Sequence, residues 1–423
     1  MTRTTSPKVA GYAALAALGL FAALVAHRPE LAAASVPFAL FLTRVRGLRA
    51  PAIELTGYAL ERRRALEGED IPARLQIHAS AAVDELSVTV LTPPGLTVEP
   101  ASISLSMSAG EDRPLDVVIH CNRWGGYALG EVALVARDAH GLFTYTGAGS
   151  KPSTLRVYPR AEALRSMVVP YETQPYAGNL VARRAGSGIE FADVRPFQPG
   201  DQLRTINWRA SARRTALLVN ERHLEQNSDV VLFLDTFAEL RGYGVSSLDL
   251  AVRAAASLSA RYLEDKDRVG LVAFGGILRW LMPGGGLPQL YQIVEALLTT
   301  DVVFSYAWKH ASVIPRRMLP PNALVIALTP LLDERGAQAL LDLRARGYDI
   351  AVVEIAPGQF LAEPTSDIER LARRLWALQR DSLRLRYRRL GVSVAEWVNP
   401  ASVDSIVEEV KRSRRHGRIA RVS

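Results

Sequence analysis

The chain has 423 residues, of which 48% are hydrophobic and 22% charged, so it is not a mostly disordered chain, a collagen-like fibre or a coiled-coil rod. Its one cysteine, Cys121, excludes an internal disulfide framework and a four-thiolate zinc site. The net charge is +8, yet six basic residues and no acidic one lie in 411–423. The body is therefore nearly neutral, and we do not expect it to bind nucleic acid.

Two apolar runs near the N-terminus, 9–26 and 31–42, predict a membrane anchor over 1–48. As a helix the first run reaches about 27 Å, close to the hydrocarbon thickness of about 30 Å. The second run is too short to span by itself, but the arginines that follow it can extend toward the interface.

The charges that flank these runs predict their orientation. Arg3 and Lys8 precede the first run, and Arg44 and Arg46 follow the second. Because positive charge prefers the cytoplasmic side, we expect a transmembrane hairpin in the cell membrane with the body in the cytoplasm. The alternatives are a signal peptide cut near 32–34, a single span with the body outside, and a soluble protein whose first helix is buried.

Residues 50–160 show a period of two in their hydrophobic positions. Leu86, Val88 and Val90, for example, alternate with polar residues, and glycine- or proline-rich turns separate such runs. This pattern predicts an antiparallel β-sandwich of six to eight strands. It contains no evident catalytic cluster, which favours a spacer or binding module.

Residues 227–400 alternate short apolar runs with helical patterns, as in the amphipathic stretch 246–264. The order predicts an α/β, Rossmann-like domain with a mainly parallel sheet and helices on both faces. Ligands collect at the carboxyl ends of such strands, which here are Asp235, Phe274, Thr329 with Pro330, and Ile355. The run 284–286 lacks the rest of a phosphate loop and predicts a flexible loop. A C-terminal helix and a solvated basic tail over 401–423 complete the chain.

The segment 161–226 joins these two parts and contains a dense mixture of charged and aromatic residues. Arginine pairs with carboxylates in a planar fork, so this segment predicts a charge network around Phe191, Phe197 and Trp208 that connects the domains. The alternative is a recognition surface for a partner. Neighbouring arginines lower carboxylate pKa values, which argues against a general acid. The candidate residues are Gly188, Glu190, Phe191, Asp193, Arg195, Phe197, Gly200, Asp201, Arg204, Asn207, Trp208, Ser211 and Arg213.

The pattern G-x-E-F-x-D-x-R-x-F-x-P-G-D-x-x-R-x-I-N-W-x-x-S-A-R over these residues resembles the signature of a bacterial family, domain of unknown function family 58. The run 121–144, CNRWGGYALGEVALVARDAHGLFT, is similar to that family's last sandwich hairpin. The resemblance covers about 51–400. It implies a membrane-anchored N-terminus, a β-sandwich and a von Willebrand factor A-like domain, with a MoxR-type AAA+ ATPase and client proteins as partners. It implies no known reaction.

A von Willebrand factor A-like domain commonly holds Mg²⁺ through D-x-S-x-S, a threonine and a further aspartate. Asp235 matches the first ligand, but Phe237 and Glu239 stand where the serines would be. Pro330, after Thr329, stands where the last aspartate would be. We therefore expect a degenerate site with no metal ion and no cofactor, in which Asp235 caps the following turn and Glu239 pairs with an arginine.

The function favoured by these features is a non-enzymatic, membrane-tethered adaptor or scaffold that presents its α/β domain to the ATPase and to protein clients, without a small-molecule substrate. The alternative is a hydrolase or other enzyme using Asp201 or Asp235, although the sequence offers no evident Ser/His or Cys/His pair. A minor alternative is binding of anionic lipid or nucleic acid through the basic tail.

Overall fold

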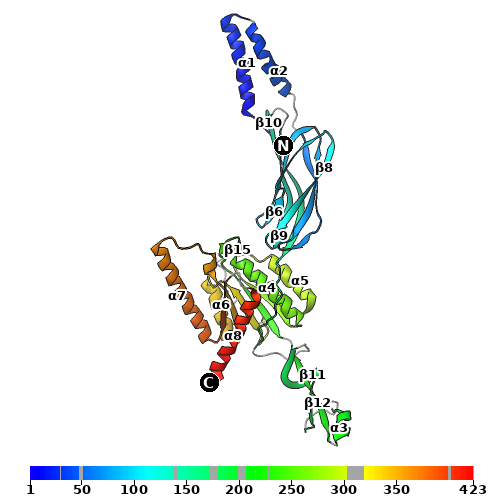
Figure 1. Ribbon diagram of the computed structural model, residues 1–423, viewed down its shortest axis with the longest axis vertical. Coiled ribbons are helices and arrows are strands. Elements are labelled where there is room, and N and C mark those ends of the chain that lie inside the picture. The colour runs from blue at the N-terminus through cyan, green and yellow to red at the C-terminus, as the bar shows by residue number, and fades with distance from the viewer. Residues whose placement is uncertain are drawn as a thin grey trace. The chain divides into compact units, whose positions relative to one another are not determined.

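The computed structural model describes residues 1–28, 30–46, 51–137, 141–170, 180–198, 206–214, 216–226, 228–302, 319–398 and 402–422. The chain divides into two compact units, Met1–Tyr158 and Pro159–Ser423. The first unit contains an N-terminal helical pair and a β-sandwich. The second contains a small two-stranded sheet and an α/β domain (Figure 1).

The two apolar runs form helices α1 (Pro7–Ala26) and α2 (Glu30–Arg46), which lie side by side (Figure 1). Tyr12 stacks on Phe38 with ring centroids 6.0 Å apart. A methyl group at Gly19 would lie 3.0 Å from Cβ of Ser35, so the glycine permits the close approach. The two predicted helices are present and α2 continues through Pro37, whereas a hairpin that crosses the membrane stays a prediction.

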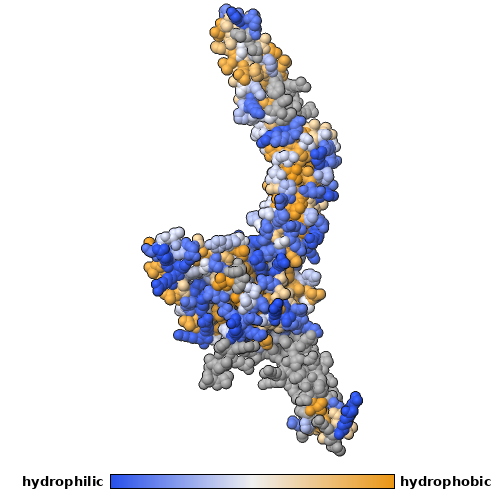
Figure 2. Space-filling model, in the orientation of Figure 1, coloured by the Kyte–Doolittle hydropathy of each residue, from blue (hydrophilic) through white to orange (hydrophobic). Residues whose placement is uncertain are grey.

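Helix α1 is long and apolar enough to cross a membrane. Hydrophobic residues cover much of the surface of both helices in Figure 2. Before α1, strand β1 (Thr2–Thr5) pairs antiparallel with β10 of the sandwich, with Thr2 opposite Thr146. The chain therefore leaves the sandwich into α1 and returns to it from α2, an arrangement that the sequence did not predict.

The sandwich contains a mainly antiparallel sheet ordered β1-β10-β9-β5-β7, in which β3 pairs parallel with β10, and an antiparallel sheet ordered β2-β4-β8-β6. Its own strands, β2 to β10, number nine in the described residues, one more than the predicted range. Their bounds are β2 Ile53–Leu60, β3 Arg64–Leu66, β4 Asp70–Ala79, β5 Val83–Leu91, β6 Leu96–Glu99, β7 Ser102–Met107, β8 Glu111–Cys121, β9 Gly125–Arg137 and β10 Phe143–Tyr158. The predicted alternation is present, since Leu86, Val88 and Val90 are buried between the sheets.

The α/β domain has a six-stranded sheet in the order β17-β16-β13-β18-β19-β20. All its strands are parallel except the edge strand β17. The strands are β13 Asp229–Thr236, β16 Arg268–Gly275, β17 Arg279–Gly284, β18 Leu324–Thr329, β19 Asp349–Ile355 and β20 Ser393–Trp397. The short strands β14 (Arg241–Gly242) and β15 (Val245–Ser246) form a separate pair. The mainly parallel sheet agrees with the prediction.

Helices lie on both faces of this sheet, as Figure 1 shows. The helices are α4 Ser247–Glu264, α5 Gly286–Leu298, α6 Glu334–Ala345, η4 Pro357–Phe360, α7 Asp367–Arg389 and α8 Val403–Val422. Ser246 and Asp249 form a reciprocal capping box at the start of α4. Helices α6 and α7 share one hydrophobic core with the sheet, and α4 packs against the other face.

Two expectations for this domain are wrong. The glycines 284–286 form the junction between β17 and α5, not a flexible loop, because the side chain of Gln289 fills the space beside Gly284 and donates to Val269 O and Met282 O. The basic tail is helical within α8, and Arg414 is buried, where it pairs with Asp349 at 2.5 Å. This arginine is therefore part of the fold and not a solvated terminal charge.

Candidate functional site

The carboxyl ends of β13 and β18 meet where the strand order reverses, the usual ligand position in a doubly wound sheet. Asp235 ends β13 and Thr329 ends β18. The Thr329 hydroxyl donates to Asp235 Oδ2 at 2.6 Å, and the amide of Phe237 donates to Asp235 Oδ1 at 3.1 Å. The predicted cap of the turn by Asp235 is confirmed.

This carboxyl group is enclosed by protein. Asp235 is 4% exposed, and a methyl group at Gly336 would lie 2.8 Å from its Oδ2. Burial raises the pKa of Asp235 to about 6, against the opposing effect of the hydrogen bonds from Thr329 and Phe237. The glycine lets helix α6 begin directly beside the carboxyl group.

The other positions of the expected metal site have different contacts. Phe237 points into the core and packs edge-on against Phe274. Glu239 accepts a hydrogen bond from Arg241 Nε at 2.7 Å, as predicted. Pro330 contributes only its backbone carbonyl, which accepts from Arg380. Within the described residues, no three His, Cys, Asp or Glu side chains lie close enough to hold a metal ion together; the metal-free state of Asp235 stays a prediction.

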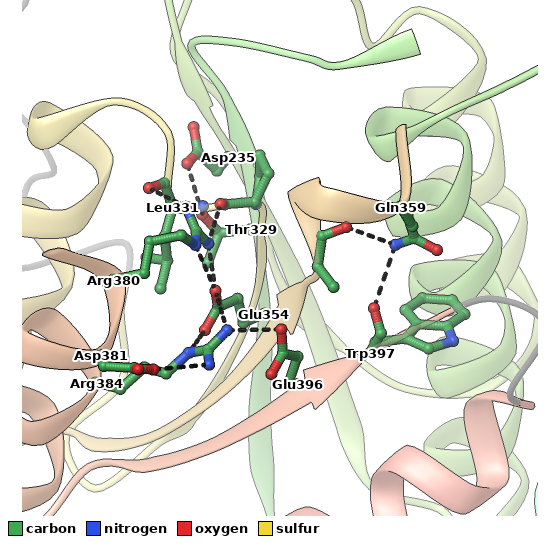
Figure 3. Close-up of polar contacts among 12 residues, drawn as sticks. Asp235, Thr329, Leu331, Glu354, Gln359, Arg380, Asp381, Arg384, Glu396 and Trp397 are labelled. Atoms are coloured by element: carbon green, nitrogen blue, oxygen red, sulfur yellow. Dashed lines mark hydrogen bonds and ion pairs between the residues drawn. The ribbon is translucent and has the colours of Figure 1, made fainter. Parts of the chain in front are cut away.

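Behind this edge lies a buried ion network (Figure 3). Glu354 on β19 is fully buried and pairs with Arg380 and Arg384 of α7. Arg380 also donates to Pro330 O at 2.7 Å and to Leu331 O at 3.2 Å. Helix α7 is thus tied both to β19 and to the loop after Thr329, a network that sequence reasoning missed because its members are 26 residues or more apart.

A cavity of about 680 Å³ lies between α6 and α7, beside this loop. Its described wall includes Asp333, Arg335, Trp376 and Arg380 but neither Asp235 nor any serine, cysteine or histidine. Asp333 is occupied as the cap of α6 and by Arg335 at 2.7 Å, which lowers the pKa of Asp333. These residues provide no nucleophile and base pair for a hydrolase.

The family-like signature begins in β11 (Leu180–Pro196) and ends in helix α3 (Trp208–Arg214); β11 forms a separate two-stranded sheet with β12 (Leu218–Gln226). Asn207 caps α3 by accepting from the amide of Ala210 at 3.0 Å. Ser211 is buried and accepts from the amide of Leu218 at 2.9 Å. The helix is therefore fastened to β12 through two of the predicted residues.

Only part of the predicted charge network lies in the described residues. Trp208 is 67% exposed and does not form its centre, because α3 packs on β12 through Ser211 and its neighbours. Phe197 is half-buried and Arg213 exposed. Five further residues are placed in β11 by their backbone alone: Gly188, Glu190, Phe191, Asp193 and Arg195. Gly200, Asp201 and Arg204, together with the β11 side chains of the network, lie outside the described part of the chain.

The sheet edge at β17 exposes large apolar side chains on the turn before β17, on β17 itself and on helix α5; Trp280, paired with Val272 of the α6–α7 core, lies on the other sheet face from α5, which packs with α4. The exposed side chains include two aromatic residues and a methionine, types that are enriched in protein interfaces. Their exposed fractions are Ile277 48%, Trp280 46%, Met282 51%, Leu287 68% and Tyr291 65%. We call these five residues the β17–α5 patch. These side chains are exposed and do not belong to the hydrophobic core, and an exposed apolar surface here was not predicted from the sequence.

The fold and its sites define a doubly wound α/β domain with a sealed switch point, preceded by a β-sandwich and an apolar helical pair. Residues 193–358 match the family described as "Protein of unknown function DUF58". The chain is also 25% identical over 152 residues to "Uncharacterized protein YeaD" of Bacillus subtilis (strain 168), covering 36% of each chain. The chain thus spans about a third of the length of the curated relative it matches.

Solved structures resemble about a quarter of the chain. The cupredoxin domain of amoB from Nitrosocaldus yellowstonii is 10% identical, covering 26% of this chain and 88% of that one, with a TM-score of 0.20. The C-terminal domain of wzt is 11% identical, covering 30% and 90%, with a TM-score of 0.21. A non-cellulosomal cohesin from the archaeon Archaeoglobus fulgidus is 16% identical, covering 26% and 91%, with a TM-score of 0.18.

Proposed function

We propose that this chain is a non-enzymatic, membrane-anchored adaptor of the DUF58 type. Its α/β domain is of the von Willebrand factor A-like kind and binds a MoxR-type AAA+ ATPase and client proteins. The observation that carries the proposal is the β17–α5 patch, because exposed tryptophan, tyrosine and methionine on adjacent elements provide anchors for a protein partner. The match of residues 193–358 to the family supports the choice of partner.

Anchoring follows from α1, which is long and apolar enough to span a bilayer. The pairing of β1 with β10 before α1 begins supports an N-terminus on the same side of the membrane as the sandwich. This arrangement favours the helical hairpin over a single span. The basic residues Arg3 and Lys8 next to α1 support a cytoplasmic location for that side, where an AAA+ ATPase and its nucleotide are available.

A catalytic role for Asp235 has less support. Its carboxyl group is buried, and both oxygens accept hydrogen bonds from the protein. A carboxylate acting as a base or nucleophile needs an approach for substrate and water, which this enclosure does not provide. Binding of partners through the exposed β17–α5 patch requires neither catalysis nor a metal ion.

The test is in-cell photo-crosslinking from a probe at Tyr291, with mass spectrometry of the products. An AAA+ ATPase should be recovered with the otherwise unmodified chain, and its yield should fall at least about tenfold when Trp280→Ala is added. Tyr243→Ala is the matched control, because Tyr243 is 84% exposed but lies outside the patch. Recovery that is equal in both variants, or no ATPase in any sample, would reject the proposal.

A further inference from the structure

Helix α7 packs on its own domain through a mixed side, in which Leu383 and Tyr387 join the hydrophobic core beside Arg380 and Arg384. Arg380 and Tyr387 are the buried residues of this helix, and Arg384 is largely covered. Their contacts are polar as well, because both arginines pair with Glu354 and the Tyr387 hydroxyl donates to Ala337 O at 2.7 Å. A surface helix ordinarily turns its apolar side to the core, but α7 leaves all of its leucines and isoleucines except Leu383 exposed to solvent.

The opposite side of α7 carries a row of large apolar side chains exposed to solvent. Their exposed fractions are Ile368 81%, Leu371 60%, Leu375 54%, Leu378 59% and Leu385 52%. The spacing alternates between three and four residues, with Ser382 at the one polar step. This is the a/d spacing of a two-stranded coiled coil, in which a second helix covers such a row. We call these six residues the α7 stripe.

The charges beside the stripe indicate which helix fits it. With Ile368 at position a, the g positions are Asp367, Arg374, Asp381 and Arg388. In an antiparallel pair of identical helices, g positions face g positions. When Leu375 lies beside the second copy's Leu378, Asp367 faces Arg388 and Arg374 faces Asp381, and the two-fold axis repeats both pairs. Every g–g contact is then between opposite charges.

The same register completes the apolar layers. Ile368 packs against the second copy's Leu385, and Leu375 against its Leu378; only the layer of Leu371 with Ser382 contains a polar group. A parallel pair would instead bring the arginine-rich C-terminal ends together, with Arg386, Arg388 and Arg389 of both copies adjacent. The antiparallel pair also places the C-terminus of each helix beside the N-terminus of the other. The partial charges at these ends are opposite, so the two helix dipoles attract.

We propose that the α7 stripe is the docking surface for a second copy of this chain, and that two α7 helices form an antiparallel coiled coil about a two-fold axis. The domain packs on the opposite side of each helix, so both copies keep their Glu354 network intact. The exposed g-position carboxylates are available for this exchange, since Asp367 is 94% and Asp381 62% exposed and each pairs only with an arginine of its own helix.

The test measures the oligomeric state of the full chain in detergent or nanodiscs by native mass spectrometry and sedimentation. Wild type should form a dimer, and Leu375→Asp should leave a monomer. Ser382→Leu should tighten the dimer, because it replaces the one polar group in the layers. Leu91→Asp is the control, since Leu91 is an exposed leucine of the sandwich, 45% exposed, and its substitution should leave the dimer intact.

A charge exchange distinguishes this dimer from other occupants of the stripe. Arg374→Glu alone, or Asp381→Arg alone, should weaken the dimer about tenfold or more, and the double variant should restore it. A membrane surface or an unrelated protein would not show this restoration. A chain that is monomeric at all concentrations, or whose Ser382→Leu variant binds anionic vesicles more tightly without dimerising, would overturn the proposal.

Cysteine crosslinking tests the orientation. In a background without Cys121, Ile368→Cys and Leu385→Cys lie about 25 Å apart along α7. The antiparallel pair predicts a disulfide-linked dimer when the two single variants are mixed, and little or none from either variant by itself. Crosslinks within each separate variant but not in the mixture would show a parallel pair and contradict the proposed register.

Discussion

The hydroxyl of Thr329 donates a 2.6 Å hydrogen bond to Asp235 Oδ2 across the reversal point of the sheet. In a doubly wound domain this position ordinarily opens to a ligand. Here it closes on itself, because Thr329 Oγ1 also accepts from the amide of Leu331 at 2.9 Å. Leu331 adopts a positive φ of 50°, and its carbonyl is held by Arg380. A continuous chain of hydrogen bonds therefore links the carboxyl end of β13, the loop after β18 and helix α7.

Replacing Asp235 by asparagine should change how stability depends on pH. The folded pKa of about 6 lies above the ordinary 3.8, so the protonated carboxyl stabilises the fold. That contribution is complete below pH 3.8 and is lost as the pH rises through 6. Because asparagine cannot ionise, the stability of Asp235→Asn relative to wild type should rise by roughly 2 kcal/mol from pH 4 to pH 7. Urea unfolding of wild type and Asp235→Asn at pH 4 and pH 7 measures the free energy of unfolding of each. A difference between the two chains that is the same at both pH values would refute the prediction.

Removing Glu354 should destabilise the α/β domain strongly. Glu354→Ala leaves Arg380 and Arg384 without their buried carboxylate, and breaking such a network typically costs about 3–5 kcal/mol. Asp116→Ala is the control, because it breaks an exposed pair with Arg74 in the sandwich and should leave the melting temperature unchanged. Calorimetry of both variants makes the comparison. A Glu354→Ala chain that melts like wild type would show that the network contributes little.

Divalent metal should not bind at Asp235. The carboxyl group is enclosed, and Phe237 and Pro330 provide no side-chain oxygen toward an octahedral shell. Calorimetric titration of the full chain in detergent with Mg²⁺ and Mn²⁺ should give no saturable heat below the millimolar range. Saturable binding that Asp235→Ala removes would mean that the edge can open around an ion.

Labelling in intact cells should place the helical turn outside and the body inside. Cys121 is buried and is replaced by alanine for this purpose. A cysteine at Arg28, in the exposed turn after α1, should react with an impermeant maleimide, whereas a cysteine at Asp116 in the sandwich should react only after lysis. Immediate labelling at Asp116 would exclude the cytoplasmic location and, with it, an ATPase partner.

Fastening of α3 to β12 should depend on Ser211 and not on Trp208. Ser211→Val leaves the buried amide of Leu218 without its partner, at a cost of about 1–3 kcal/mol for the unpaired group, whereas the Leu218 carbonyl still accepts from the amide of Asn207. Trp208→Ala, the matched change on the exposed side of α3, should have little effect. Hydrogen exchange of the Leu218 amide measures both, and equal protection in the two variants would contradict the assignment.

The sequence alone determined the elements whose causes are local. Apolar runs predicted the helical pair, the period of two predicted the sandwich strands, and the amphipathic stretch 246–264 predicted helix α4. The turn after Asp235 and the pairing of Glu239 were also predictable, because each partner lies two residues away. Such contacts depend on backbone geometry over a few residues, which the order of residue types sets.

Tertiary structure decided what depends on distant partners. Nothing local indicates that Thr2 lies opposite Thr146, that Arg414 is buried against Asp349, or that Glu354 holds two arginines of α7. The apolar spacing in α7 would by itself assign that row to the core; it faces solvent because Arg380 and Arg384 satisfy the buried Glu354 on the other side. A buried carboxylate must be paired, and this requirement selects the face of the helix that turns inward.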